Sequence, residues 1–130
     1  VAVSDVLPDN LPPVFADRVL LEQVLLNLLR NAIDANRERH LGAPSQVRLE
    51  AGEADACLAI RVIDQGPGVS DEQMAKLFTP FYTSKADGLG LGLSMSRSII
   101  EGFGGALEAS PAEGGGLCLE CRLPLGRDDV

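Results

Sequence analysis

Three stretches of the chain carry an apolar residue at every second position: residues 46–52 (QVRLEAG), 57–64 (CLAIRVID) and 117–123 (LCLECRL). Neighbouring side chains of a β-strand point to opposite faces, so each stretch predicts a strand with one apolar face. Such a sheet has to cover that face with another layer and can leave the other face to water. This requirement favours a two-layer fold.

Two amphipathic segments are long enough to supply the covering layer. Residues 17–40 have apolar side chains at helical spacing behind Asp17, which we expect to be the N-cap, and residues 92–103 repeat the pattern. A short helix is expected over residues 70–78, capped by Ser70. The remaining strands are expected over 1–6 and 105–110, and the strand that contains residues 117–123 is expected to extend over 116–125. The order strand, helix, strands, helices, strands predicts an α/β (α+β) two-layer sandwich, with a mixed sheet covered on one face by helices.

Size and composition are those of one domain. The chain has 130 residues, of which 45% are hydrophobic, and a net charge of −8, which disfavours a sequence-independent nucleic-acid binder. No apolar run is long enough to span a membrane. Because Val1 opens a strand without a targeting segment, we expect residues 1–130 to be one domain cut from a larger protein. Cys118 and Cys121 form a CxxC but point to opposite strand faces, so reduced thiols are favoured over a metal site.

One face of the first long helix is polar. Asn27, Asn31 and Asp34 follow the spacing i, i+4, i+7 and therefore share a face beside an apolar stripe of Leu21, Val24, Leu25, Leu28 and Ala32. A stripe facing solvent is the plainer interpretation of these three residues. The alternative is the polar floor of a ligand site, in which an asparagine oxygen ligates Mg²⁺.

The segment DQGPG follows the second predicted strand. Asp64 shares a strand face with Leu58, Ile60 and Val62, so it should be directed into the interior, where a carboxylate needs hydrogen-bond donors. The amino group of adenine is one such donor, whereas guanine has a carbonyl at the equivalent position, so this contact would select ATP over GTP. A β-turn without a ligand is an equally good interpretation of these residues alone.

An aromatic segment and a glycine run precede the second long helix. Phe78, Phe81 and Tyr82 stand just before Lys85, either as a small satellite core or as the anchors of a mobile lid. Glycine at every second position of GLGLGLS leaves the backbone open to phosphate at a helix start. No strand feeds this run directly and no GxxxxGK[ST] is present, so Rossmann and P-loop sites are excluded.

Taken in order, these segments resemble the four sequence boxes of the sensor histidine kinase catalytic domain. LEQVLLNLLRNAIDA resembles its N box, DQGPG its G1 box, LFTPFYTSK its F box and GLGLGLS its G2 box. The resemblance covers nearly the whole chain and implies the Bergerat ATP-binding fold (the GHKL superfamily, with gyrase, Hsp90 and MutL). The short lid and the NAIDA sequence look most similar to nitrogen-regulation and dicarboxylate sensor kinases.

The resemblance also implies cofactors and residue roles. ATP and Mg²⁺ would be bound, with Asn31 as the metal ligand assisted by Asn27, Asp64 on the adenine amino group and Lys85 reaching the phosphates from the lid. Asp34 stands where some of these kinases have a phosphate-binding lysine. The other implied ATP contacts are Gly66, Gly68 and Val69 at the base and Gly88, Leu89, Gly90, Leu91, Gly92 and Leu93 along the triphosphate.

The implied activity is transfer of the γ-phosphate to a histidine on a separate dimerisation domain of the same protein, upstream of a response regulator. The fragment would be a monomeric cytoplasmic domain, and its parent a homodimer, for which anchoring in the inner membrane is left open. His40 is expected to be a solvated residue at a frayed helix end, and no residue here is expected to be catalytic. A related ATPase, an anti-sigma-factor serine kinase or a nucleotide-binding module without chemistry are the alternatives.

Overall fold

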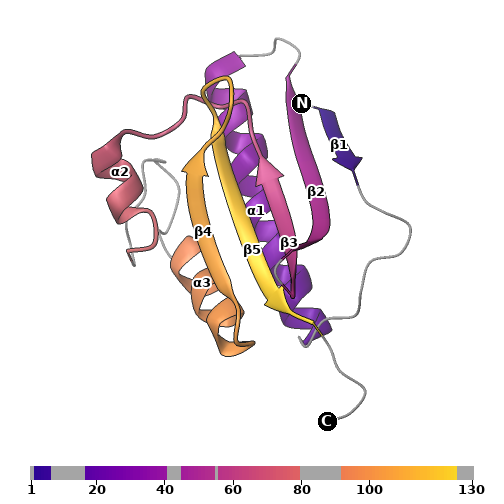
Figure 1. Cartoon of the computed structure of the whole chain (residues 1–130). Helices are drawn as coiled ribbons and strands as arrows, with labels where there is room; N and C mark the ends of the chain where they lie inside the picture. The colour runs from indigo at the N-terminus through magenta and orange to yellow at the C-terminus, as the bar shows by residue number, and fades with distance from the viewer. Residues whose placement is uncertain (1, 7–16, 41–44, 55, 80–91, 126–130) are drawn as a thin grey trace.

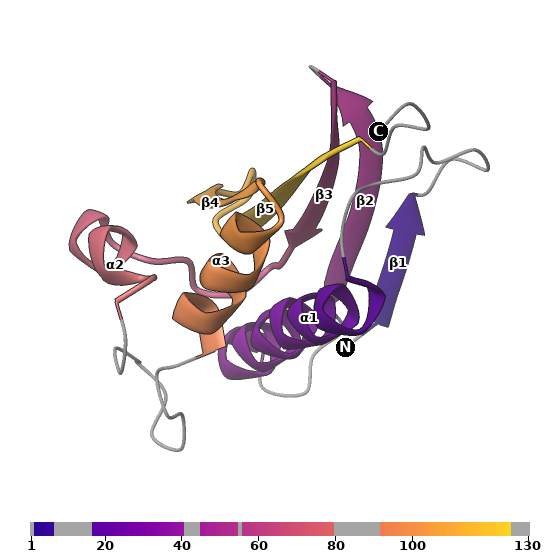
Figure 2. The same ribbon diagram turned by 90° about the horizontal axis from the view of Figure 1, so that it is seen from below.

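A computed structural model describes residues 2–6, 17–40, 45–54, 56–79 and 92–125. A sheet forms one layer, and the helices α1 and α3 lie together on one of its faces (Figures 1 and 2). In chain order the elements are β1 (Ala2–Val6), α1 (Arg18–His40), β2 (Gln46–Ala54), β3 (Cys57–Ile63), α2 (Asp71–Lys76), α3 (Gly92–Gly102), β4 (Ala106–Pro111) and β5 (Leu117–Pro124). The predicted element order and the two-layer architecture are confirmed.

The five strands of the described sheet lie in the order β1-β2-β3-β5-β4. β1 pairs with β2 in parallel, and the other neighbours are antiparallel, so the sheet is mixed as predicted. The register places Leu49 opposite Val62 and Val62 opposite Leu119. The apolar sides of β2, β3 and β5 therefore form one continuous face.

The core lies between that face and the helices. Val24, Leu28 and Ala32 of α1 are buried against it, and Ile100 of α3 completes the helix layer. Facing them on the strands are Val47, Leu58, Ile60, Val62, Leu107, Leu119, Cys121 and Leu123. The α1 stripe expected to face the sheet does so.

Local caps fix where two of the helices begin. The backbone N–H of Leu20 donates to the Asp17 carboxylate over 3.0 Å, which confirms Asp17 as the N-cap of α1. Ser70 and Gln73 form a reciprocal capping box at the start of α2. None of the described helices is long and apolar enough to cross a membrane.

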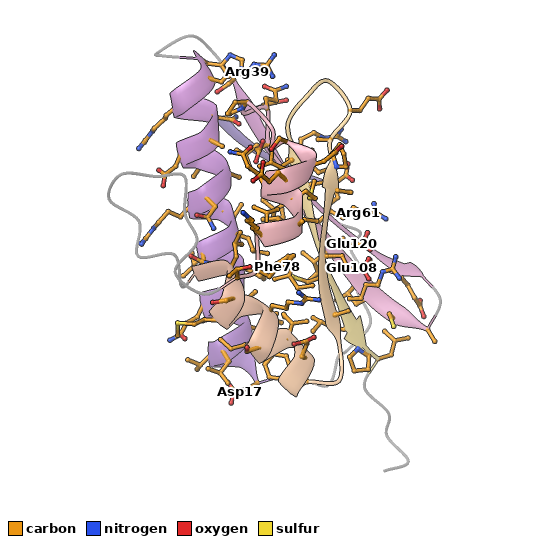
Figure 3. All side chains as sticks on the ribbon, turned by 90° about the vertical axis from the view of Figure 1, so that its left-hand side faces the viewer. Asp17, Arg39, Arg61, Phe78, Glu108 and Glu120 are labelled. Atoms are coloured by element: carbon orange, nitrogen blue, oxygen red, sulfur yellow. The ribbon has the colours of Figure 1, made fainter. Side chains whose placement is uncertain are left out.

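The opposite face of the sheet is charged. Glu50, Arg61, Glu120 and Glu108 lie side by side on β2, β3, β5 and β4, on the side away from α1 and α3 (Figure 3). Arg61 donates to Glu120 over 2.7 Å.

The cysteines behave as the strand alternation predicts. Cys121 is buried in the core, while Cys118 lies on the charged face, and the described residues contain no group of three potential metal ligands. Burial raises the pKa of the Cys121 thiol to about 12. All three cysteines are free thiols.

Candidate functional site

Asp64 lies just beyond the end of β3 and is almost completely buried, with 6% of its surface exposed. Its Oδ1 accepts hydrogen bonds from the backbone N–H groups of Gly66 (2.9 Å) and Leu117 (3.0 Å). Its own backbone N–H donates to the carbonyl of Leu117 over 3.0 Å. The interior orientation predicted from the strand alternation is confirmed, and backbone donors from β5 and the loop hold the carboxylate in place.

The glycines around Asp64 are there because the backbone passes too close to other groups for a side chain. A Cβ on Gly66 would lie 2.6 Å from the Cβ of Ala35, and one on Gly116 would overlap the backbone oxygen of Asp64. Gly68 has φ +73°, in the left-handed region, and a Cβ there would lie 2.5 Å from the carbonyl oxygen of Gly115. The loop after β3 thus packs closely between α1 and the β4–β5 turn. Sequence reasoning missed the contact of the β4–β5 turn with Asp64.

Two residues near the end of α1, Asn36 and Arg39, hydrogen-bond to the same loop, a role that sequence reasoning missed. Asn36, with 0% exposure, accepts from the Gln65 N–H over 2.7 Å and donates to the Gln46 carbonyl over 2.8 Å. Arg39 donates to the carbonyl of Gly66 over 3.0 Å. The available signal was that Asn36 follows Val24, Leu28 and Ala32 at four-residue spacing, inside the apolar stripe.

His40 is the last residue of α1 and is partly exposed, as expected for a surface residue at a helix end. Its Nε2 also lies 2.8 Å from the Gln65 carbonyl oxygen, to which it donates. Sequence reasoning missed this contact with the loop after β3.

The polar face of α1 lies beside α3. Asn27, Asn31 and Asp34 are each half-buried, so they do not form an open solvent-facing stripe. The Asn27 side-chain amide donates to the hydroxyl of Ser96 over 3.1 Å, and Ser96 is itself buried in α3. Sequence reasoning did not single out Ser96.

The loop that carries Asp64 approaches α1 close to the polar face of this helix. Ala35, which Gly66 contacts, directly follows Asp34, so the loop that carries Asp64 meets α1 next to its polar face. A buried carboxylate acceptor therefore stands at one end of a half-buried row of amide and carboxylate side chains. This arrangement can accept hydrogen bonds at one end and supply oxygen ligands along the helix.

Residues 16–127 match the family described as "Histidine kinase-, DNA gyrase B-, and HSP90-like ATPase". The chain belongs to this family. Among curated relatives it is 41% identical over 129 residues to the C4-dicarboxylate transport sensor protein DctS of Rhodobacter capsulatus, covering 98% of this chain and 19% of that protein. It is 39% identical over 117 residues to the sensor histidine kinase ZraS of Escherichia coli K12, covering 90% of this chain and 24% of ZraS.

Solved histidine kinase structures share the fold. The nucleotide-free catalytic domain of histidine kinase ThkA superposes with a TM-score of 0.77 at 32% identity, covering 95% of this chain and 77% of that domain. Full-length ShkA in complex with AMPPNP gives a TM-score of 0.80 at 28% identity, covering 96% of this chain and 26% of ShkA. The chain is thus a histidine kinase catalytic domain by family and fold, and it spans about a fifth to a quarter of the curated relatives named above.

Part of the predicted site lies outside the described residues: Phe81, Tyr82, Lys85, Gly88, Leu89, Gly90 and Leu91. At the border, Gly92 opens α3, and the Leu93 side chain packs against the core. Val69 is half-buried in the loop before α2. Phe78 joins the main core instead of a satellite one, and the Arg97 guanidinium lies 4.8 Å from the centre of its ring.

Proposed function

We propose that this chain, residues 1–130, is the ATP-binding domain of a two-component sensor kinase. It would bind Mg-ATP and present the γ-phosphate to a histidine on a separate domain of the same protein. The observation that carries the proposal is the buried Asp64 carboxylate, fixed by backbone donors beside two loop glycines in a chain of this family. The AMPPNP complex of the structural neighbour ShkA supports the choice of ligand.

Asp64 is proposed to recognise the base. An ionised carboxylate offers only acceptors, and the amino group of adenine supplies the matching donor. Guanine would place a carbonyl oxygen against the carboxylate and would be repelled. Gly66, Gly68 and Val69 would form the surroundings of the base, since the loop backbone can approach closely only where side chains are absent.

The polar face of α1 fits a magnesium ion. Mg²⁺ prefers oxygen ligands and keeps waters and phosphate oxygens in its shell, so one or two protein ligands suffice. Asn31 would be the main ligand, with Asn27 assisting. Because the Asn27 amide nitrogen donates to Ser96, its oxygen is the end that would ligate a metal. Bound there, the ion would neutralise phosphate charge, and Asp34 would border this part of the site.

The triphosphate is proposed to lie at the start of α3. Backbone N–H groups at a helix N-terminus bind anions, and the glycine run ending at Gly92 opens this helix. Leu93 would contribute only its backbone, because its side chain packs in the core. Lys85 would add a positive charge to the phosphates.

Asn27 is also the reason to expect transfer instead of hydrolysis. In ATP-hydrolysing members of the superfamily a glutamate occupies this position and activates water, whereas a neutral amide cannot accept a proton at neutral pH. Phosphoryl transfer depends mostly on positioning and electrostatic stabilisation, so a nucleophile delivered in line can still react. The chain spans 19% of DctS, and we propose that the nucleophile comes from another part of the parent protein.

The test is a transfer assay with γ-³²P-labelled ATP. The chain is incubated alone and with the histidine-bearing domain of its parent, and a His40→Gln variant serves as the control. We expect an acid-labile, base-stable label on the added domain only, equal for both variants, and negligible hydrolysis by the chain alone. Robust hydrolysis that Asp64→Asn abolishes would favour the ATPase alternative. Binding without transfer would leave a nucleotide-binding module, and label at His40 would contradict the proposal.

A further inference from the structure

Asn36 is a fully buried polar residue to which the proposed ATP site assigns no contact. Both ends of its side-chain amide are used within the protein: Oδ1 accepts from the Gln65 N–H over 2.7 Å, and Nδ2 donates to the Gln46 carbonyl over 2.8 Å. A backbone N–H can only donate and a carbonyl can only accept, so the orientation of the amide is fixed. Asn36 thus joins α1 to the start of β2 and to the loop after β3.

The bond to Gln65 acts directly on the base-recognition residue. The Gln65 N–H belongs to the peptide that joins Asp64 to Gln65, so Asn36 fixes the plane of that peptide. The next N–H along the chain, that of Gly66, donates to Asp64 Oδ1 over 2.9 Å. A rotation of the Asp64–Gln65 peptide would therefore displace the carboxylate and its Gly66 N–H donor.

Neighbouring contacts restrict the loop in the same way. Arg39 donates to the Gly66 carbonyl, and the Gln65 side-chain oxygen accepts from the Gln46 N–H over 2.8 Å. Gly66 itself lies against Ala35. The last turns of α1 thus hold the Asp64–Gln65 peptide through Asn36 and the Gly66–Pro67 peptide through Arg39.

We propose that Asn36 is a positioning residue for nucleotide-base selection, holding the Asp64 carboxylate where it meets the base before nucleotide binds. The proposal rests on the proposed function, in which Asp64 selects adenine. Binding costs less free energy when the recognising group already has its bound geometry, because less conformational freedom is lost. Loss of Asn36 would take this partner from the Gln65 N–H and the Gln46 carbonyl and release the loop.

The test compares Asn36→Leu with two controls. Leu107→Ala removes a buried side chain of β4 and lowers stability without touching the loop, and Ser45→Ala removes a buried hydroxyl with no hydrogen-bond partner in the described part of the chain. ATP and GTP affinities are measured by calorimetry well below each melting temperature. We expect Asn36→Leu to weaken ATP about 10-fold and GTP hardly at all, since the loss of one buried hydrogen-bonded group is of this size. Both controls should keep the ATP-to-GTP ratio.

A merely structural role would give a different result. Asn36→Leu would then behave like Leu107→Ala at matched stability, and an unchanged ratio would overturn the proposal. Where Asn36→Leu does not fold, the exposed Arg39 provides the decisive variant, because Arg39→Ala removes its bonds to the Gln65 and Gly66 carbonyls while leaving Asn36 in place. A roughly 3-fold fall in the ratio is expected for it, in line with the loss of hydrogen bonds from an exposed side chain, and an unchanged ratio would overturn the proposal.

Amide hydrogen exchange separates this inference from the proposed function, because it needs no nucleotide. In the unliganded protein the Gln65 and Gly66 N–H groups should exchange about 10-fold faster in Asn36→Leu, or in Arg39→Ala where only that variant folds, than in Leu107→Ala. Unchanged exchange would refute the positioning role even if ATP binds. A wild-type chain that does not distinguish ATP from GTP would instead refute the proposed role of Asp64.

Discussion

The two ends of the candidate site are built differently, although both lie along α1. At the loop after β3, Asp64 and Asn36 are buried and form hydrogen bonds with backbone groups. Along the middle of α1, Asn27, Asn31 and Asp34 are half-buried side chains, and Asn27 is tied to another side chain, that of Ser96. The fold fixes the geometry of the first end, whereas the second end supplies side-chain oxygens that can ligate a metal. We therefore expect base selection to be insensitive to metal and phosphate binding to depend on it.

Asp64→Asn should cause the largest loss of ATP affinity, because it changes the carboxylate that is proposed to recognise the base. The amide oxygen can still accept from the two backbone donors, so the fold should survive, but the amide nitrogen would place a donor against the adenine amino group. We expect about a 100-fold loss of ATP affinity by calorimetry, typical of losing a charge-assisted buried bond. An intact melting temperature is the control. A loss below about 3-fold would show that Asp64 is structural.

Gly66→Ala tests whether the close approach of the loop to α1 shapes the first end. The new methyl group would lie 2.6 Å from the Cβ of Ala35, so the loop or the helix has to shift. We expect a loss of about 1–3 kcal/mol in the free energy of unfolding, as for other overpacked sites. Gly52→Ala is the matched control, because nothing lies within 4 Å of a Cβ there. Equal denaturation midpoints for the two variants would contradict the close contact.

Asn31→Ala should affect the second end only when magnesium is present. If Asn31 ligates the metal, ATP affinity should fall about 10-fold with Mg²⁺ and remain unchanged in EDTA, since one oxygen ligand is lost. The ATP-to-GTP ratio should stay the same in both conditions. Equal losses with and without Mg²⁺ would mean that Asn31 supports the fold instead.

Glu120 lies on the charged face of the sheet, away from the helices (Figure 3). Glu120→Gln should therefore change neither base selection nor the metal dependence of ATP binding. Burial by itself raises the pKa of Glu120, but hydrogen bonds from Arg61 and Arg122 outweigh it, so the pKa lies below the ordinary 4.5. The charge therefore stabilises the fold above that value, and the benefit is lost as pH falls through the lowered pKa. We expect Glu120→Gln to lower the free energy of unfolding by about 0.5–1 kcal/mol at pH 7. In the acid limb of the stability curve, where the free energy of unfolding falls with falling pH, the variant should show a smaller decrease. An unchanged acid limb, or altered ATP affinity, would contradict this.

Features set by neighbouring residues could be predicted from the sequence. The caps at Asp17 and Ser70 and the interior orientation of Asp64 follow from local spacing, and each is confirmed. Asn36 could be noticed as a polar residue in an apolar stripe, but its partners could not be named. Its bond to Gln65 spans 29 positions, and that of Asp64 to Leu117 spans 53. Such contacts depend on which strands and helices become neighbours, which no local pattern records.

The most direct test of the account is a calorimetric titration of the wild-type chain with ATP, ADP and GTP, with and without Mg²⁺. The account predicts that ATP and ADP bind at least about 10-fold more tightly than GTP, and that this preference for adenine is the same in Mg²⁺ and in EDTA. GTP binding as tightly as ATP, or a preference that disappears when the metal is removed, would contradict a base site built by the fold around Asp64.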